Sequence, residues 1–267
     1  MLNCKAIHYA VGAKTILTDV SMSVQAGETV ALCGPNGAGK STLLRIASGE
    51  MAPSHGHVTL LDTPLSQWKP SDLAQARAKL SQESHLTFAF RVREVVEMGR
   101  FPHEAATSHD DIVDACMSMV GVRDLADRDY TTLSGGEKQR VHMARVLAQL
   151  TDTSDQPKLL LLDEPTSALD LHHQEVVLAL AHQLCRDRGY GVLVVLHDLN
   201  LAAAWADRVV LLREGGVHEQ GPPDQVLNES VLRSVYGVDA LVIPHPISGR
   251  PIITIDRRAL LVNPDSH

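Results

Sequence analysis

The chain has 267 residues, of which 44% are hydrophobic and 21% charged, the composition of an ordinary globular protein that can bury a sizeable core. Its formal net charge of −8 argues against nucleic acid as an obligate partner, because phosphate backbones are bound by clustered positive charge. No apolar run approaches the ~18 residues of a membrane span, and the first residues lack a signal-peptide core, so we expect a cytoplasmic protein or one that reaches the membrane through a partner.

In chain order, the first clear element is a short apolar strand at residues 29–33, followed by a glycine-rich loop and a helix that Gly49 ends. Two further strands, at residues 159–163 and 192–197, are apolar on both faces, as in a covered parallel sheet. A helical pattern over residues 171–189 separates these two strands. This strand–helix–strand alternation predicts an α/β fold.

The middle of the chain differs from this pattern. Residues 91–150 contain several helical signals and no convincing strand, which predicts an all-helical insertion into the α/β core. The region after Pro222 begins with short helical pieces, and residues 252–262 have the composition of two small strands.

A phosphate-binding loop follows the first predicted strand. The segment "GPNGAGKST" fits G-x-x-x-x-G-K-[ST], with a strand before it and a helix after it, which disfavours an incidental glycine-rich turn. Backbone N–H groups of such a loop surround phosphates, its lysine reaches the β- and γ-phosphates, and the following hydroxyl binds Mg²⁺. The predicted nucleotide-binding residues are Gly34, Pro35, Asn36, Gly37, Ala38, Gly39, Lys40, Ser41 and Thr42.

Polar residues also end the other two predicted strands. Asp163 follows four leucines and is placed to hold Mg²⁺, and the adjacent Glu164 is a candidate general base for the attacking water. His197 lies at a strand's carboxyl edge, where ligands of open α/β sheets bind, and is a candidate contact for the γ-phosphate. Asp198 is interpreted as a helix N-cap.

A second glycine pair, in "LSGGE", precedes a helical run instead of following a strand. Ser134, Gly135 and Gly136 leave a helix N-terminus stripped of large side chains, which favours an anion such as a γ-phosphate. Within one chain this segment has no obvious route to the phosphate-binding loop. Two copies facing head to tail would bring each "LSGGE" helix to the other copy's loop.

Taken together, these motifs resemble the ATP-binding-cassette ATPases. Gly34–Ser41, Gln82, "LSGGE", "LLLLDE", "SALD" and His197 occur in the order found in that family, and the resemblance covers nearly the whole chain. It implies a RecA-like P-loop NTPase core over 1–85 and 155–240, with an N-terminal antiparallel β subdomain, an inserted α-helical subdomain over 86–154, and a tail over 241–267.

The resemblance also implies roles for further residues. Tyr9 would stack on adenine, Gln82 would link Mg²⁺ and the attacking water to the helical subdomain, and Asp170 would cross the interface of a cassette homodimer. ATP and Mg²⁺ are the implied ligands. The implied catalytic set is Glu164, His197 and Gln82.

A cassette without membrane helices needs a permease, and two segments suggest which kind. The stretch "VREVVEMGRFPH" is similar to one in importers of ferric siderophores, haem and cobalamin. The long polar link "LAQLTDTSDQPK" resembles haem-importer cassettes, so haemin import is the favoured hypothesis. It implies two permease copies, a periplasmic binding protein and a position at the cytoplasmic face of the inner membrane.

Two alternatives remain open on sequence alone. The cassette could serve a ferric-siderophore or cobalamin importer, since a cassette does not touch the transported molecule. It could also be a soluble cassette ATPase of iron–sulfur cluster assembly, which carries the same motifs in a chain of similar size.

Overall fold

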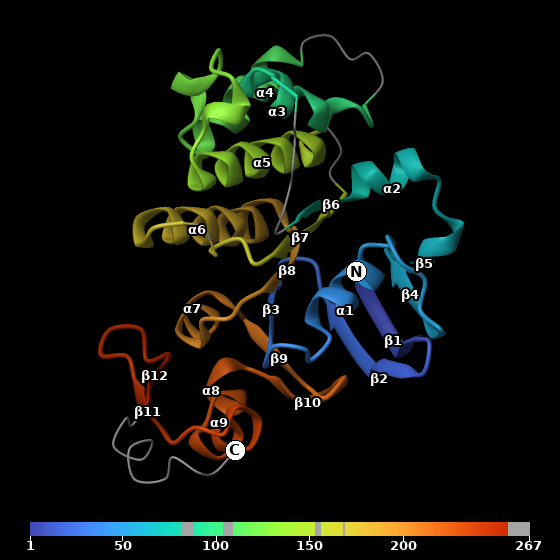
Figure 1. The fold of residues 1–267 in the computed structure, drawn as a ribbon, viewed down its shortest axis with the longest axis vertical. Coiled ribbons are helices and arrows are strands. Elements are labelled where there is room, and N and C mark those ends of the chain that lie inside the picture. The colour runs from blue at the N-terminus through green and yellow to red at the C-terminus, as the bar shows by residue number, and fades with distance from the viewer. Residues whose placement is uncertain (82–87, 104–108, 153–155, 168, 256–267) are drawn as a thin grey trace.

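The computed structural model of the chain describes residues 1–81, 88–103, 109–152, 156–167 and 169–255 (Figure 1). The strands are β1 Leu2–Val11, β2 Lys14–Val24, β3 Thr29–Cys33, β4 His55–Leu60, β5 Thr63–Pro64, β6 Arg77–Leu80, β7 Leu159–Asp163, β8 Gly191–Val195, β9 Arg208–Arg213, β10 Gly216–Gly221, β11 Ala240–Pro244 and β12 Pro251–Ile255. The α-helices are α1 Lys40–Ala47, α2 Pro70–Ala76, α3 Val92–Glu97, α4 Asp110–Met119, α5 Gly135–Leu150, α6 Leu171–Arg188, α7 Leu199–Trp205, α8 Pro223–Val226 and α9 Glu229–Tyr236.

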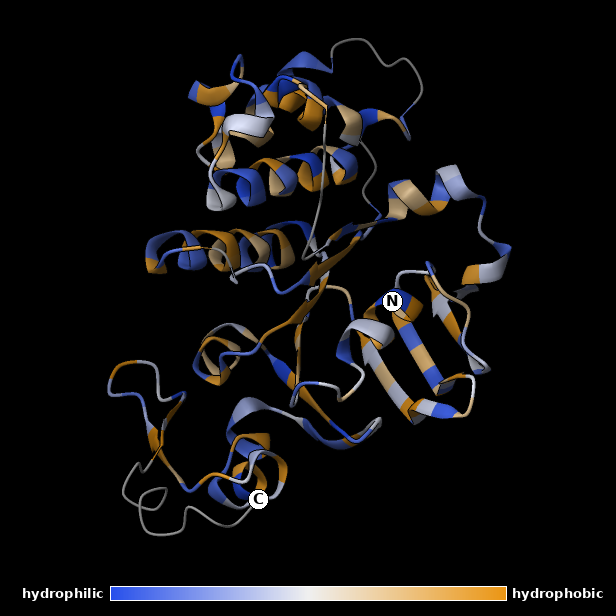
Figure 2. Ribbon diagram, in the orientation of Figure 1, coloured by the Kyte–Doolittle hydropathy of each residue, from blue (hydrophilic) through white to orange (hydrophobic). Residues whose placement is uncertain are grey.

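A six-stranded sheet in the order β10-β9-β3-β8-β7-β6 forms the centre of the molecule. Its strands are parallel except for β10, which pairs antiparallel with β9. Every residue of β3, β7 and β8 is buried, which explains their continuous apolar sequences. In Figure 2 the hydrophobic colour follows these strands. The predicted α/β fold class is therefore confirmed.

Alternate residues of β7 build the two cores on either side of the sheet. Leu160 and Leu162 point into the core formed with α5, α6 and α7, whereas Leu159 and Leu161 point into the core shared with α1 and the N-terminal strands. Side chains of successive strand residues point to opposite faces, so four consecutive leucines serve both cores. Each fully buried leucine contributes about 1.5–3 kcal/mol relative to an exposed one.

The N-terminal strands form a separate antiparallel sheet in the order β2-β1-β4-β5, beside α1 (Figure 1). Val20 and Leu17 of β2 pack in the same core as Leu43 and Leu44 of α1. This arrangement agrees with the antiparallel subdomain that the family resemblance implies.

Helices α3, α4 and α5 form a group at one end of the molecule (Figure 1). Among the described residues of 91–150 the structure has helices, short 3₁₀ turns and an isolated bridge between Arg91 and Asp129, as predicted for this region. Within this group, the buried Arg100, which lies just after α3, donates hydrogen bonds to the carbonyls of Ala148 and Thr151 at the end of α5. The exact domain boundaries stay a prediction.

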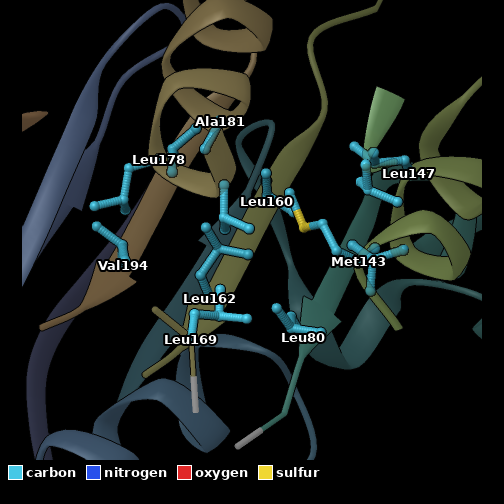
Figure 3. Packing of buried hydrophobic residues seen from close by; sticks show 14 of the residues in the cluster. Leu80, Met143, Leu147, Leu160, Leu162, Leu169, Leu178, Ala181 and Val194 are labelled. Atoms are coloured by element: carbon cyan, nitrogen blue, oxygen red, sulfur yellow. The ribbon is translucent and has the colours of Figure 1, made fainter. Parts of the chain in front are cut away.

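The sheet also anchors α5. Met143 and Leu147 of this helix pack beside Leu80 of β6 and Leu160 of β7 (Figure 3). One face of α5 therefore belongs to the core of the parallel sheet, although the helix begins within the helical group.

The C-terminal region contains the predicted short helices, α8 and α9, and then a hairpin of β11 and β12. β12 covers the start of the segment predicted as two strands; its partner β11 was not predicted, and residues 256–262 of that segment lie outside the described ranges. The hairpin is held to α7, where Asn200 accepts from the Ile253 N–H at 2.8 Å and donates to the Ile253 carbonyl at 3.1 Å. Nowhere in the described ranges does a helix combine the length and apolar character needed to cross a membrane.

Candidate nucleotide-hydrolysis site

The glycine-rich loop connects β3 to α1 and folds as it does because only glycine fits at two of its positions. Gly34 has a φ of 142°, and a Cβ there would lie 2.2 Å from the Leu212 carbonyl oxygen. Gly39 has a φ of 99°, and its Cβ would lie 2.6 Å from a methyl of Leu17. Both contacts are far below van der Waals distance, and both φ values strain residues that carry a Cβ. The glycine spacing thus lets β9 and β2 approach the loop closely.

The loop forms one wall of a cleft of about 430 Å³. Residues predicted to bind nucleotide contribute much of its lining, together with Glu164 and His197. From the loop and α1 the lining residues are Asn36, Gly37, Gly39, Lys40, Ser41 and Thr42. Gly34, Pro35 and Ala38 shape the loop without lining the cleft, and Ala38 is buried in the core.

Lys40 is buried and folds back over its own loop. Its ammonium donates to the carbonyl oxygens of Gly34 at 2.7 Å and Pro35 at 3.0 Å. Burial lowers the pKa of Lys40, and the nearby carboxylates of Glu164 and Asp163 partly oppose that shift. A bound phosphate would offer this ammonium charged acceptors, which are stronger than carbonyls.

Asp163 ends β7 with a buried side chain. Burial raises its pKa, the Lys79 ammonium partly opposes that shift, and the charge of Glu164 adds to it. Among the described residues, its Oδ1 oxygen is a buried atom with no hydrogen-bond partner. Such an oxygen fits a hard divalent cation. Ser41, the predicted second ligand, lines the cleft. The described residues hold no cluster of three or more metal-ligating side chains.

Glu164 and His197 are in direct contact across the carboxyl ends of β7 and β8. Oε1 of Glu164 and Nε2 of His197 form a hydrogen bond of 2.5 Å. β8 ends at Val195, two residues earlier than predicted, so His197 lies just after the strand, at the edge of the cleft. Glu164 has a φ of 50°, an uncommon conformation for a residue with a side chain, often found at functional sites.

Among the described residues predicted for the site, Ser134, Gly135, Gly136, Asp170 and Tyr9 do not line this cleft. Ser134 caps α5, where its hydroxyl accepts from the Glu137 N–H at 3.4 Å, and Glu137 accepts from the Ser134 N–H at 2.8 Å. Asp170 caps α6 by accepting from the N–H of His173 at 2.9 Å, a contact that lowers the pKa of the Asp170 carboxyl. Tyr9 is half-buried against the N-terminal core. Gln82 lies outside the described residues.

Several lining residues were missed by sequence reasoning. Lys14, Thr15 and Ile16 come from the start of β2, and Glu214 and Gly215 come from the turn between β9 and β10. The two segments meet because the Thr18 N–H donates to the Gly215 carbonyl at 2.8 Å. They are about 200 residues apart in the chain, and no local motif links them.

Comparison with known proteins shows the family to which the chain belongs. The sequence profile of the ABC transporter family matches residues 17–167, more than half of the chain. The chain belongs to this family. The predicted resemblance to ATP-binding-cassette ATPases is therefore confirmed.

Individual ABC proteins resemble the chain over nearly its whole length. It is 44% identical over 256 residues to the hemin import ATP-binding protein HmuV of Escherichia coli O157:H7, covering 96% of this chain and 100% of that protein. It is 48% identical over 252 residues to the protein of the same name from Plesiomonas shigelloides, covering 90% of this chain and 95% of that protein.

Solved structures of ABC proteins also resemble the chain. An inward-facing metal-chelate type ABC transporter matches with a TM-score of 0.80 and 27% identity, covering 97% of this chain and 98% of that one. A dimeric, post-hydrolysis form of the cassette MJ0796, bound to ADP and Pi, matches with a TM-score of 0.73 and 27% identity, covering 84% and 99%.

Proposed function

We propose that this chain is the ATP-hydrolysing subunit of a haemin importer. The observation that carries the proposal is the identity of 44–48% with hemin import ATP-binding proteins over 90% or more of both chains. The cleft described above supports the ATPase activity.

The phosphates of ATP would lie along the loop from Asn36 to Thr42. The Lys40 ammonium would exchange the carbonyls of Gly34 and Pro35 for the β- and γ-phosphate oxygens. Asp163 and Ser41 would hold Mg²⁺. When bound, that ion neutralises charge on the phosphates and polarises the γ-phosphoryl group.

Glu164 would act as the general base. Its carboxylate would accept a proton from water as the water oxygen attacks the γ-phosphorus and the bond from that phosphorus to the bridging oxygen of ADP breaks. His197, 2.5 Å from this carboxylate, would orient it and contact the γ-phosphate. A positioned base typically contributes 10²–10⁴-fold in rate.

The other predicted residues would act in a homodimer of cassettes. Ser134, Gly135 and Gly136 would bind the γ-phosphate held by the partner copy, and Asp170 would cross the interface. Tyr9 would stack on adenine. The likeness to a dimeric cassette with bound ADP and Pi supports this arrangement. Gln82 would contact the attacking water and Mg²⁺.

The dimer would bind two copies of a membrane permease at the cytoplasmic face of the inner membrane. A periplasmic binding protein would deliver haemin to the permease from the other side. Closing the cassettes around two ATP molecules and opening them after hydrolysis would drive transport.

The test is growth of the source organism with Glu164→Gln in the chromosomal gene, and haemin, a ferric siderophore or free iron as sole iron source. We expect failure on haemin alone, because the variant binds ATP but turns over at least about 100-fold more slowly. Glu219→Gln makes the same chemical change at an exposed position of β10 and should grow normally on all three.

Other outcomes identify the alternatives. Failure on the siderophore alone would replace haemin with a siderophore as the cargo. Failure on cobalamin alone, in a separate cobalamin-dependent medium, would indicate a cobalamin importer. Growth under every condition, with the ATPase found in the soluble fraction, would favour iron–sulfur cluster assembly.

A further inference from the structure

The side chain of Gln139, on α5, reaches the backbone beside the catalytic carboxylate. Its Nε2 group donates to the Pro165 carbonyl at 2.5 Å and to the Glu164 carbonyl at 3.4 Å. Both acceptors are carbonyl oxygens, which fixes the orientation of the amide. Its Oε1 oxygen is buried and has no hydrogen-bond partner in the described part of the chain. The amide group of Gln139 is therefore directed at the loop that follows β7.

The spacing of residues along α5 explains why Gln139 reaches the loop after β7. It lies one turn before Met143 and two turns before Leu147, so it shares the helix face that packs on the parallel sheet (Figure 3). That face meets β6 and β7, and the loop after β7 begins with Glu164. The two apolar side chains fix α5 to the sheet, and Gln139 continues the contact onto the loop.

The backbone that Gln139 holds is strained. Glu164 has a φ of 50°, and such a conformation persists only where the surroundings hold it. From a second helix, α6, Gln174 donates to the carbonyls of Thr166 at 3.1 Å and Leu169 at 3.0 Å. Two glutamine amides, one from α5 and one from α6, thus bind the carbonyls of Glu164, Pro165, Thr166 and Leu169.

The same helix begins at the residues proposed to bind the partner's γ-phosphate. Gln139 is five residues after Ser134, which is about 7.5 Å along a rigid helix. We propose that Gln139 is a positioning residue for Glu164, and that it transmits occupancy of the partner's ATP site through α5 to this chain's own general base. This inference rests on the proposed dimeric ATPase function.

A matched control lies on the same helix. Gln149 also donates through Nε2 to two carbonyls, those of Ala74 at 2.8 Å and Arg77 at 3.1 Å, but these belong to α2 and the start of β6. Gln139→Met and Gln149→Met each keep the side-chain volume and remove two donated hydrogen bonds. They should lower the melting temperature similarly.

The first measurement is ATP hydrolysis by the purified chain as a function of ATP concentration. We expect Gln139→Met to lower kcat about tenfold, which corresponds to about 1.4 kcal/mol, with KM little changed and the Hill coefficient falling towards one. Gln149→Met should stay within about twofold of the wild type. If Gln139→Met does not fold, Gln139→Glu removes the donor with a polar side chain of the same length.

The second measurement uses mixed dimers in which one protomer carries Glu164→Gln and only the other can hydrolyse ATP. Gln139→Met in the active protomer should lower activity, and Gln139→Met in the inactive protomer should lower it much less. Loss mainly from the inactive protomer would mean that Gln139 shapes its own Ser134–Gly136 segment, which overturns the positioning role.

Different results would contradict the proposed ATPase function and the proposed role of Gln139. A wild-type chain that does not hydrolyse ATP contradicts the proposed function. An active wild type whose Gln139→Met variant matches Gln149→Met in kcat and Hill coefficient overturns the role of Gln139 alone.

Discussion

Replacing Gly34 with alanine should damage both stability and ATP binding. The new Cβ would lie 2.2 Å from the Leu212 carbonyl oxygen, at least about 1 Å too close, so the loop or the end of β9 must move. Such overpacking costs about 1–3 kcal/mol. The strained φ of 142° adds about 1 kcal/mol. We expect the free energy of unfolding to fall by about 2–4 kcal/mol, which lowers the melting temperature of a chain this size by roughly 4–16 °C.

The same movement should weaken ATP binding. The Gly34 carbonyl accepts a hydrogen bond from the Lys40 ammonium, so moving Gly34 alters the phosphate-binding loop. Thermal unfolding and nucleotide titration measure the two effects. Gly189→Ala is the matched control, since Gly189 also has a positive φ, of 65°, but a Cβ there meets no described heavy atom of another segment within 4 Å. If Gly34→Ala were no more damaging than Gly189→Ala in both assays, the close approach of β9 would not be what requires glycine.

Two further substitutions test the electrostatics and the C-terminal hairpin. Burial raises the pKa of Asp163, so its ionisation costs more in the folded chain than in the unfolded one, and stability present at acid pH is lost as pH rises through the folded pKa. Asp163→Asn should therefore raise the free energy of unfolding at neutral pH, and it should reduce Mg²⁺-dependent hydrolysis about 100-fold or more. A destabilised variant in urea titration would contradict this. Arg250 donates to the carbonyls of Ala203 at 2.9 Å and Ala206 at 2.7 Å, so Arg250→Ala should lower stability by about 1.5–3 kcal/mol in the same titration, with ATP affinity unchanged.

The parts of the site that lie within one continuous segment could be predicted from the sequence. The strand, the glycine spacing and the lysine of the phosphate-binding loop act through local backbone geometry, and the four leucines before Asp163 reveal a strand buried on both faces. Ser134 and Asp170 follow the local rules of helix capping, so the sequence also indicates their positions at the starts of α5 and α6.

Contacts that depend on strand order could not be predicted from local patterns. Glu164 meets His197 only because β7 and β8 are neighbours in the sheet, and nothing in either segment specifies this pairing. The cleft wall formed by Glu214 and Gly215 depends on the approach of the β9–β10 turn to β2. Gln139 lies two residues after the "LSGGE" segment, but its contact with the Pro165 carbonyl requires α5 to pack on the sheet.

The charges of the cleft explain why the ATP site would need a second copy. The charged side chains that line the cleft are the ammonium groups of Lys14 and Lys40 and the carboxylates of Glu164 and Glu214, so their formal charges cancel and leave the charge of a polyanionic triphosphate unbalanced. Mg²⁺ at Asp163 would offset part of this charge, and the helix N-terminus at Ser134, which carries about half a positive charge, would offset more. Ser134 does not line its own chain's cleft, so in the proposed homodimer this contribution would come from the partner copy. ATP would then stabilise the closed dimer, and loss of the γ-phosphate would remove the anion that joins the two copies.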